Sequence, residues 1–139
     1  MKHILISGVF DLFHYGHMIL LKKCQEEYKD SILIVGIHSD EECEQFKRKP
    51  ILSYEERKKS IEVFGLPTLL CPLLETREFY EKNNIDVTVH AHSEKDHEFY
   101  VKNCYKDAAE MGILRRFEYT SVISTSKIIE RIKKNKKHI

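Results

Sequence analysis

Apolar residues occur along the chain in short unbroken runs, separated by longer segments in which they recur at helical spacing. The unbroken runs are rich in β-branched side chains and predict strands. They cover residues 3–7, 31–38, 68–71, 85–90 and 114–119. Strands that are apolar on both faces are typical of a parallel sheet with helices on each side.

The intervening segments predict helices. These cover residues 16–28, 53–63, 76–83, 96–111 and 124–134, and a further helix begins at Ser39. Ser53 and Glu56 have the spacing of a capping box, and Gly112 is placed to end a helix. Alternating strands and helices predict an α/β fold, a single Rossmann-like doubly wound domain with a mainly parallel sheet and helices on both faces. Ligands in such folds bind at the carboxyl ends of the strands.

The composition excludes several classes of function. The 139 residues suit one domain, and a net charge of +1 indicates no basic surface for a nucleic acid. No apolar run is long enough to span a bilayer, and the start of the chain lacks the pattern of a signal peptide. The four cysteines are scattered without a C-x-x-C pair, which indicates reduced thiols rather than a zinc cluster or disulfides. We therefore expect a cytoplasmic protein with no integral membrane contact.

The end of the chain differs in charge from the rest. Residues 131–139 carry five basic side chains and no acid. We therefore assign residues 1–132 to the domain and residues 133–139 to a basic, solvated C-terminal tail.

Two histidines follow the first predicted strand, in the segment Gly8-Val9-Phe10-Asp11-Leu12-Phe13-His14-Tyr15-Gly16-His17. Residues three apart on a first helical turn share a face, and a helix N-terminus attracts phosphate. Imidazole N–H groups there can donate hydrogen bonds to phosphate oxygens. The alternative is that His14 and His17 only cap backbone groups of the helix.

This segment, G-x-F-D-x-x-H-x-G-H, resembles the signature of the cytidylyltransferase family within the nucleotidylyltransferase superfamily. A second segment, Ile123-Ser124-Thr125-Ser126, resembles the I-S-T-[ST] motif of that family, which opens a helix and holds the β- and γ-phosphates of CTP. The resemblance implies transfer of CMP from CTP to the phosphate of a small phospho-alcohol, with release of pyrophosphate, Mg²⁺ bound with the nucleotide, and a homodimer. It further implies nucleotide contacts from Gly8, Val9, Phe10, Asp11, Gly16, His90, Thr120, Ile123, Ser124, Thr125 and Ser126.

The middle of the chain also resembles family segments. Lys47 follows a Ser-Asp-Glu sequence, as the catalytic lysine does in eukaryotic choline-phosphate cytidylyltransferases. Arg57 closes Ser-Tyr-Glu-Glu-Arg, which is similar to a segment of bacterial glycerol-3-phosphate cytidylyltransferases. The resemblance therefore implies that His14, His17 and Lys47 are catalytic and that Arg57 binds the acceptor phosphate. Lys49 is the alternative to Lys47 if the loop is shifted in register.

Two departures from the family pattern leave the substrates open. The family sequence Arg-Thr-Glu-Gly is replaced by Tyr119-Thr120-Ser121-Val122, and the acid that follows His90 in relatives is absent. Glycerol 3-phosphate is the best expectation for the acceptor, and choline phosphate and ethanolamine phosphate are alternatives. An adenylyltransferase acting on a sugar phosphate and a non-catalytic nucleotide-binding module are further alternatives, which a panel of nucleoside triphosphates would separate.

Overall fold

Five parallel strands form one sheet in the computed structural model, which describes residues 1–118 and 122–138. The strands are β1 (His3–Gly8), β2 (Ile32–Ile37), β3 (Thr68–Leu70), β4 (Val87–His90) and β5 (Leu114–Arg116), and their order is β3-β2-β1-β4-β5. All four neighbouring pairs are parallel. The predicted α/β, Rossmann-like fold is confirmed. Because the chain adds strands first on one side of β1 and then on the other, the sheet has a switch point between β1 and β4.

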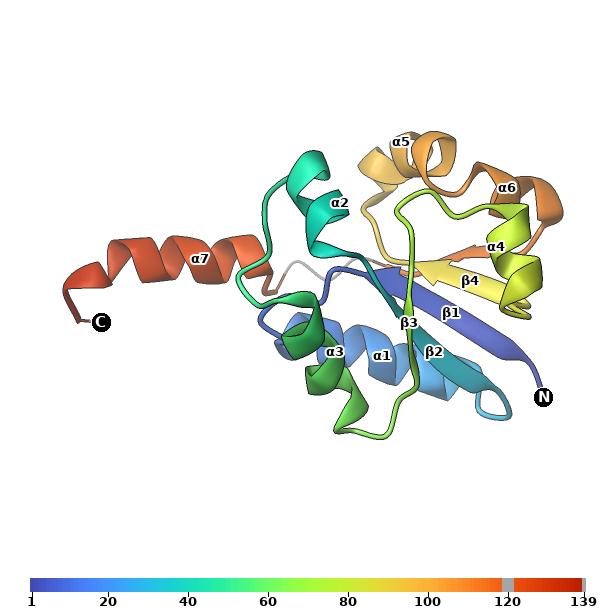
Figure 1. The fold of residues 1–139 in the computed structure, drawn as a ribbon, viewed down its shortest axis with the longest axis horizontal. Coiled ribbons are helices and arrows are strands. Elements are labelled where there is room, and N and C mark those ends of the chain that lie inside the picture. Colours follow the sequence, from blue (N-terminus) through green and yellow to red (C-terminus); the bar gives the residue numbers. More distant parts are fainter. Residues whose placement is uncertain (119–121, 139) are drawn as a thin grey trace.

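Helices cover both faces of the sheet (Figure 1). One face carries α1 and α3, and the other carries α4, α5 and α6, while α7 projects away from the sheet. The helices are α1 (Tyr15–Glu27), α2 (Asp40–Phe46), α3 (Tyr54–Glu62), α4 (Arg77–Lys82), α5 (Glu94–Asn103), α6 (Lys106–Met111) and α7 (Thr125–Lys134), followed by a 3₁₀ turn at Lys136–His138.

Alternation along the central strand divides the core into two parts. Ile4 of β1 lies in a buried cluster with Leu21 of α1 and Ile61 of α3. The next residue, Leu5, lies in the opposite cluster with Tyr80 of α4. Burying such a side chain contributes about 1.5–3 kcal/mol, so both helical layers are fixed to the strand that leads into the first motif.

One predicted helix needs correction. The helix expected over residues 96–111 is two helices, because Cys104 and Tyr105 between them are buried against the sheet and Tyr105 has non-helical backbone angles. The last predicted helix, over residues 124–134, corresponds to α7, which ends at Lys134.

Candidate active site

A cavity of about 540 Å³ lies at the carboxyl ends of β1 and β2, beside the first turns of α1 and α7. It is lined by most of the predicted site residues, namely Gly8, Val9, Phe10, Asp11, His14, Gly16, His17, Lys47, Ile123, Ser124, Thr125 and Ser126. Lys49, Arg57 and His90 do not line it, and Thr120 lies outside the described residues. The two terminal motifs, more than 100 residues apart in the chain, therefore share one cavity.

The capping of α1 orients both histidines. Nδ1 of His14 accepts the backbone N–H of Gly16 at 3.1 Å, and Nδ1 of His17 accepts the backbone N–H of His14 at 3.2 Å. Because a backbone N–H can only donate, both Nδ1 atoms lack a proton, and each neutral ring carries its proton on Nε2. The capping role and a phosphate-binding role are thus compatible, since each ring keeps an Nε2–H donor.

The two imidazoles stack with their ring centroids 3.8 Å apart, and Phe10 and Phe13 flank the ring of His17. Burial, and then the neighbouring His14, lower the pKa of His17 to about 3. Burial also lowers the pKa of His14. At neutral pH both rings are therefore hydrogen-bond donors without a charge.

Polar contacts join the first motif to the second. Oγ1 of Thr125 donates to the backbone carbonyl of Asp11 at 3.0 Å, and Nε2 of His14 lies 3.3 Å from the same Oγ1. Since the hydroxyl proton of Thr125 is directed to Asp11, the Nε2–H of His14 donates to Thr125. A Cβ on Gly16 would lie 2.9 Å from the carbonyl oxygen of Ile123, so glycine permits this close approach.

Two cations meet the N-terminus of α7. Lys47 Nζ and Arg48 Nη1 both donate to Oγ of Ser126, at 3.3 Å and 3.2 Å. Ser126 lies in the first turn of α7, where the helix dipole also favours an anion. Lys47 is a predicted residue, whereas Arg48 was missed. Its position beside Lys47 in the basic run Lys47-Arg48-Lys49 was the signal that could have found it.

The loop between β1 and α1 is held in an uncommon conformation. Phe10 and Leu12 have φ angles of 54° and 55°, a left-handed region that bulky residues rarely occupy. Between them, the carboxylate of Asp11 accepts the backbone N–H groups of Ile51 at 2.7 Å and Leu52 at 2.9 Å. Asp11 thus connects the loop between β1 and α1 to the segment that follows Lys47 and Arg48.

Arg57 lies behind this loop and does not line the cavity, which does not fit the expected contact with the acceptor phosphate. Its side chain is completely buried, and Nη2 pairs with Oδ1 of Asp40 at 2.7 Å. Nη1 donates to the carbonyl of Val9 at 2.8 Å, and Nε donates to the carbonyl of Leu52 at 3.1 Å. The Arg57 guanidinium holds the pKa of Asp40 below its usual value, against the opposing effect of burial.

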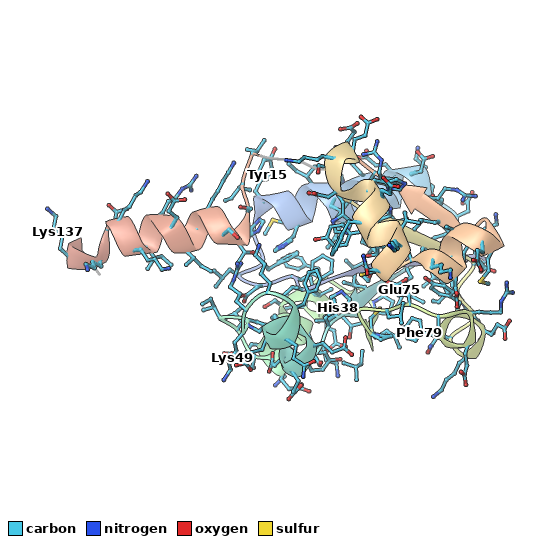
Figure 2. All side chains as sticks on the ribbon, turned by 90° about the horizontal axis from the view of Figure 1, so that it is seen from above. Tyr15, His38, Lys49, Glu75, Phe79 and Lys137 are labelled. Carbon is cyan, nitrogen blue, oxygen red and sulfur yellow. The ribbon has the colours of Figure 1, made fainter. Side chains whose placement is uncertain are left out.

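Two further predicted residues lie outside the cavity wall. Lys49 is exposed, and Figure 2 shows it at the periphery of the molecule. His90 is 1% exposed, and neither of its ring nitrogens has a hydrogen-bond partner within the described residues. Its ring lies against Tyr105 and His97, at centroid distances of 4.7 Å and 5.2 Å. Burial lowers the pKa of His90 to about 3.

A second group of lining residues has no formal charge at neutral pH and was not among the predicted site residues. It comprises Ser7, His38, His92 and Tyr105, which come from the ends of β1, β2 and β4 and from the junction of α5 and α6. We call these four residues the neutral wall. Burial lowers the pKa of His38, and it lowers the pKa of His92 to about 4. Ser7, His38 and His92 lie at or just beyond the carboxyl ends of predicted strands, which was their sequence signal. Tyr105, between two helices, had no such signal.

A family model described as cytidylyltransferase-like matches residues 5–131. The chain belongs to the cytidylyltransferase-like family. This cytidylyltransferase-like chain is 33% identical over 132 residues to glycerol-3-phosphate cytidylyltransferase of Staphylococcus aureus, and the match covers 92% of each chain. It is 32% identical over 137 residues to choline-phosphate cytidylyltransferase 2 of Arabidopsis thaliana, covering 93% of this chain and 44% of the plant protein.

A third relative is ethanolamine-phosphate cytidylyltransferase of Mus musculus, with 28% identity over 138 residues, covering 96% of this chain and 34% of the mouse protein. The cytidylyltransferase-like chain therefore spans less than half the length of the plant and mouse relatives. A solved lipopolysaccharide core biosynthesis protein from Thermoplasma volcanium shares the fold, with a TM-score of 0.64 and 19% identity over 87% of this chain and 99% of that chain. Among the helices of residues 1–118 and 122–138, none has the length and apolar character needed to cross a bilayer.

Proposed function

We propose that this protein transfers CMP from CTP to the phosphate of a small phospho-alcohol and releases pyrophosphate. The observation that carries the proposal is the meeting of two motifs in one cavity. His14, Lys47 and Arg48 all reach the first turn of α7, through Thr125 and Ser126. This arrangement supplies neutral donors, two cations and a helix N-terminus to one small volume, which suits a bound triphosphate.

The reaction needs positioning and charge stabilisation more than activation of a nucleophile. An oxygen of the acceptor phosphate forms a bond to the α-phosphorus of CTP, and the bond from that phosphorus to the bridging oxygen of the β-phosphate breaks. Pyrophosphate leaves with the electron pair. The Nε2–H of His17 donates to the transferring phosphate, and the Nε2–H of His14 does so when a phosphate oxygen replaces Oγ1 of Thr125 as its acceptor. Lys47 and Arg48 neutralise the negative charge of the two reacting anions.

Mg²⁺ is proposed to enter with the nucleotide. Within the described ranges there is no group of three or more histidine, cysteine or acidic side chains that could hold a metal ion. The Asp11 carboxylate, which lines the cavity, already accepts two backbone N–H groups. The triphosphate and water would therefore supply most ligands, and the bound ion would add positive charge beside the phosphates.

Glycerol 3-phosphate is the acceptor that we propose. The acids that line the cavity are Asp11, whose two oxygens are both engaged, and Glu118, which is exposed to solvent. A cationic acceptor such as choline phosphate would therefore find no buried lining carboxylate in the described part of the cavity. The uncharged side chains of the neutral wall suit hydroxyl groups instead.

A panel of nucleotides and acceptors tests the proposal. Pyrophosphate release is measured with CTP, ATP, GTP and UTP, each with Mg²⁺ and each with glycerol 3-phosphate, ethanolamine phosphate and choline phosphate. We expect turnover with CTP and glycerol 3-phosphate above all other pairs. Preference for ATP would favour the adenylyltransferase alternative, and CTP binding without turnover on any acceptor would favour a binding module.

The homodimer and the cytoplasmic location implied by the sequence stay predictions. Light scattering coupled to size-exclusion chromatography would test the first, with an expected mass twice that of the 16.5 kDa chain. Fractionation of cells that express the protein would test the second.

A further inference from the structure

Glu75 is a buried carboxylate that the proposed reaction does not use. It lies between β3 and α4, is 0% exposed, and has no cationic partner in the described chain. Oε2 accepts from the hydroxyl of Ser7 at 2.5 Å and from the thiol of Cys71 at 3.7 Å. Oε1 accepts from the hydroxyls of Tyr80 and Thr88, each at 2.8 Å. Four neutral donors from four segments therefore satisfy the two oxygens.

A hydroxyl group that lines the cavity connects it to this carboxylate. Ser7, its nearest donor, lines the cavity at the end of β1. The hydroxyl of Tyr105, another lining residue, lies 3.5 Å from Oγ of Ser7. The backbone N–H of Glu75 also donates to the carbonyl of Cys104 at 2.9 Å, which holds the junction of α5 and α6 in place. Figure 2 shows Glu75 and His38 in the interior, in contrast to Lys49 and Lys137 at the periphery.

The carboxylate determines how the neighbouring hydroxyls point. A serine hydroxyl has one proton, and that of Ser7 is directed to Glu75, so its remaining lone pairs are hydrogen-bond acceptors. The hydroxyl of Tyr105 is then the donor toward Ser7, which leaves the tyrosine oxygen as an acceptor as well. Burial raises the pKa of Glu75, and the bonds from Ser7, Thr88 and Tyr80 oppose that rise.

An independent contact fixes the tautomer of His38 so that it, too, offers a hydrogen-bond acceptor. Its Nδ1 lies 2.8 Å from the backbone carbonyl of Cys71, and a carbonyl can only accept, so Nδ1 carries the proton. In the neutral ring Nε2 is then an acceptor. Ser7, Tyr105 and His38 thus all offer acceptors, whereas His14, His17, Lys47 and Arg48 offer donors. The cavity is lined by two groups of opposite hydrogen-bonding character.

We propose that Glu75 is a positioning residue that sets acceptor specificity: through Ser7 and Tyr105 it makes the neutral wall select phospho-alcohols with hydrogen-bond donors at the end remote from the phosphate. This inference rests on the proposed function. The phosphate group of the acceptor substrate faces the cations. The hydroxyl or ammonium N–H groups at the other end of that substrate face Ser7, Tyr105 and His38. A quaternary ammonium has no such donor, which places choline phosphate outside the class.

The test compares acceptors that differ only in these donors. The ratio of kcat/KM for glycerol 3-phosphate to that for propyl phosphate, which lacks both hydroxyls, is measured for the wild type, Glu75→Gln and the control Glu78→Gln on the exposed side of α4. We expect the wild type and the control to prefer glycerol 3-phosphate equally. Glu75→Gln should lower this ratio at least fivefold, mainly through the KM of glycerol 3-phosphate, with the KM of CTP unchanged.

If Glu75→Gln lowered kcat/KM equally for glycerol 3-phosphate and propyl phosphate, Glu75 would be only structural and the inference would be overturned. If Glu75→Gln lacks a cooperative unfolding transition, Ser7→Ala decides in its place: a fivefold fall in the ratio supports the inference, and an unchanged ratio overturns it. The wild type should use ethanolamine phosphate, which keeps N–H donors, better than choline phosphate, and glycerol 3-phosphate better than either. Equal use of choline phosphate and glycerol 3-phosphate would contradict selection by donors. No turnover of any acceptor by the wild type would instead remove the proposed function, and the inference with it.

Discussion

The backbone N–H of His14 donates to Nδ1 of His17 at 3.2 Å. This bond, together with burial, keeps His17 neutral with its proton on Nε2, where a phosphate oxygen can accept it. The same residue thereby caps α1 and serves the site.

His17→Ala should lower kcat by about 100- to 1,000-fold, because it removes a donor that strengthens as charge develops on the transferring phosphate. The matched control, His3→Ala, changes a histidine of β1 that lies outside the cavity and should leave kcat within about twofold of the wild type. The measurement is initial-rate pyrophosphate release at saturating CTP. A kcat unchanged in His17→Ala would remove this residue from the reaction.

The basic run offers a graded comparison. Lys47→Ala and Arg48→Ala each remove a cation from the N-terminus of α7 and should each lower kcat/KM by about 100-fold. Lys49→Ala, which changes an exposed residue outside the cavity wall, should lower it by less than about threefold. If Lys49→Ala were the most damaging of the three, the register of this loop in the active enzyme would differ from the one described above.

Variants of Arg57 distinguish a positioning role from direct contact with the acceptor. Arg57→Lys keeps the charge but loses the fork that reaches Asp40, Val9 and Leu52, so it should lower kcat and raise the KM of both substrates. Arg57→Ala should lower the free energy of unfolding by about 3 kcal/mol, as measured by urea denaturation. A variant with full stability and a raised KM for the acceptor alone would indicate that Arg57 touches the acceptor after all.

Gly16→Ala should separate the two motifs. Its Cβ would lie 2.9 Å from the carbonyl oxygen of Ile123 and 3.0 Å from the ring of His14, so one of them must move. We expect kcat/KM to fall at least about tenfold, since a displacement of about 1 Å in a site can cost 100-fold. The comparison is Gly112→Ala, which strains the backbone at φ 72° at the end of α6. It should lower stability without this loss of activity.

Acid should destabilise the protein through its buried histidines. His17 and His90 have pKa values of about 3 and His92 of about 4, against 6.5 for an exposed ring. Between pH 6.5 and 4 the unfolded state binds more protons than the folded state, so the free energy of unfolding falls as the pH falls. Each histidine contributes up to about 1.4 kcal/mol per pH unit. Urea denaturation at pH 7.5, 6 and 5 measures the slope of the free energy of unfolding against pH. His90→Phe should reduce this slope by the contribution of about one bound proton. An identical slope in that variant would refute the assignment.

Local patterns were sufficient for much of the fold. Continuous apolar runs located the strands, and the Ser53–Glu56 capping box located α3. The break between α5 and α6 was missed because Cys104 and Tyr105 have no helix-breaking chemistry. What ends α5 there is burial of both residues and the bond from Glu75 to the carbonyl of Cys104, and neither leaves a trace in the local sequence.

The candidate site was predictable where its residues form a contiguous motif. The segments around His14 and Ser126 carry their chemistry in adjacent positions. Arg57 looked like a surface arginine of a helix, and only the fold brings Asp40 and the carbonyl of Val9 to its guanidinium. Glu75 gave no signal at all, because its donors come from β1, β4, α4 and the loop after β3.

The most direct test of the central claim is ³¹P NMR of the wild type with CTP, Mg²⁺ and glycerol 3-phosphate. We predict diphosphate resonances of a cytidine diphosphate ester of glycerol, together with an equal amount of pyrophosphate. Their rate of appearance should fall at least about 100-fold in His17→Ala. Retention of intact CTP and glycerol 3-phosphate by a folded wild-type protein, or formation of the product at the wild-type rate by His17→Ala, would contradict the account.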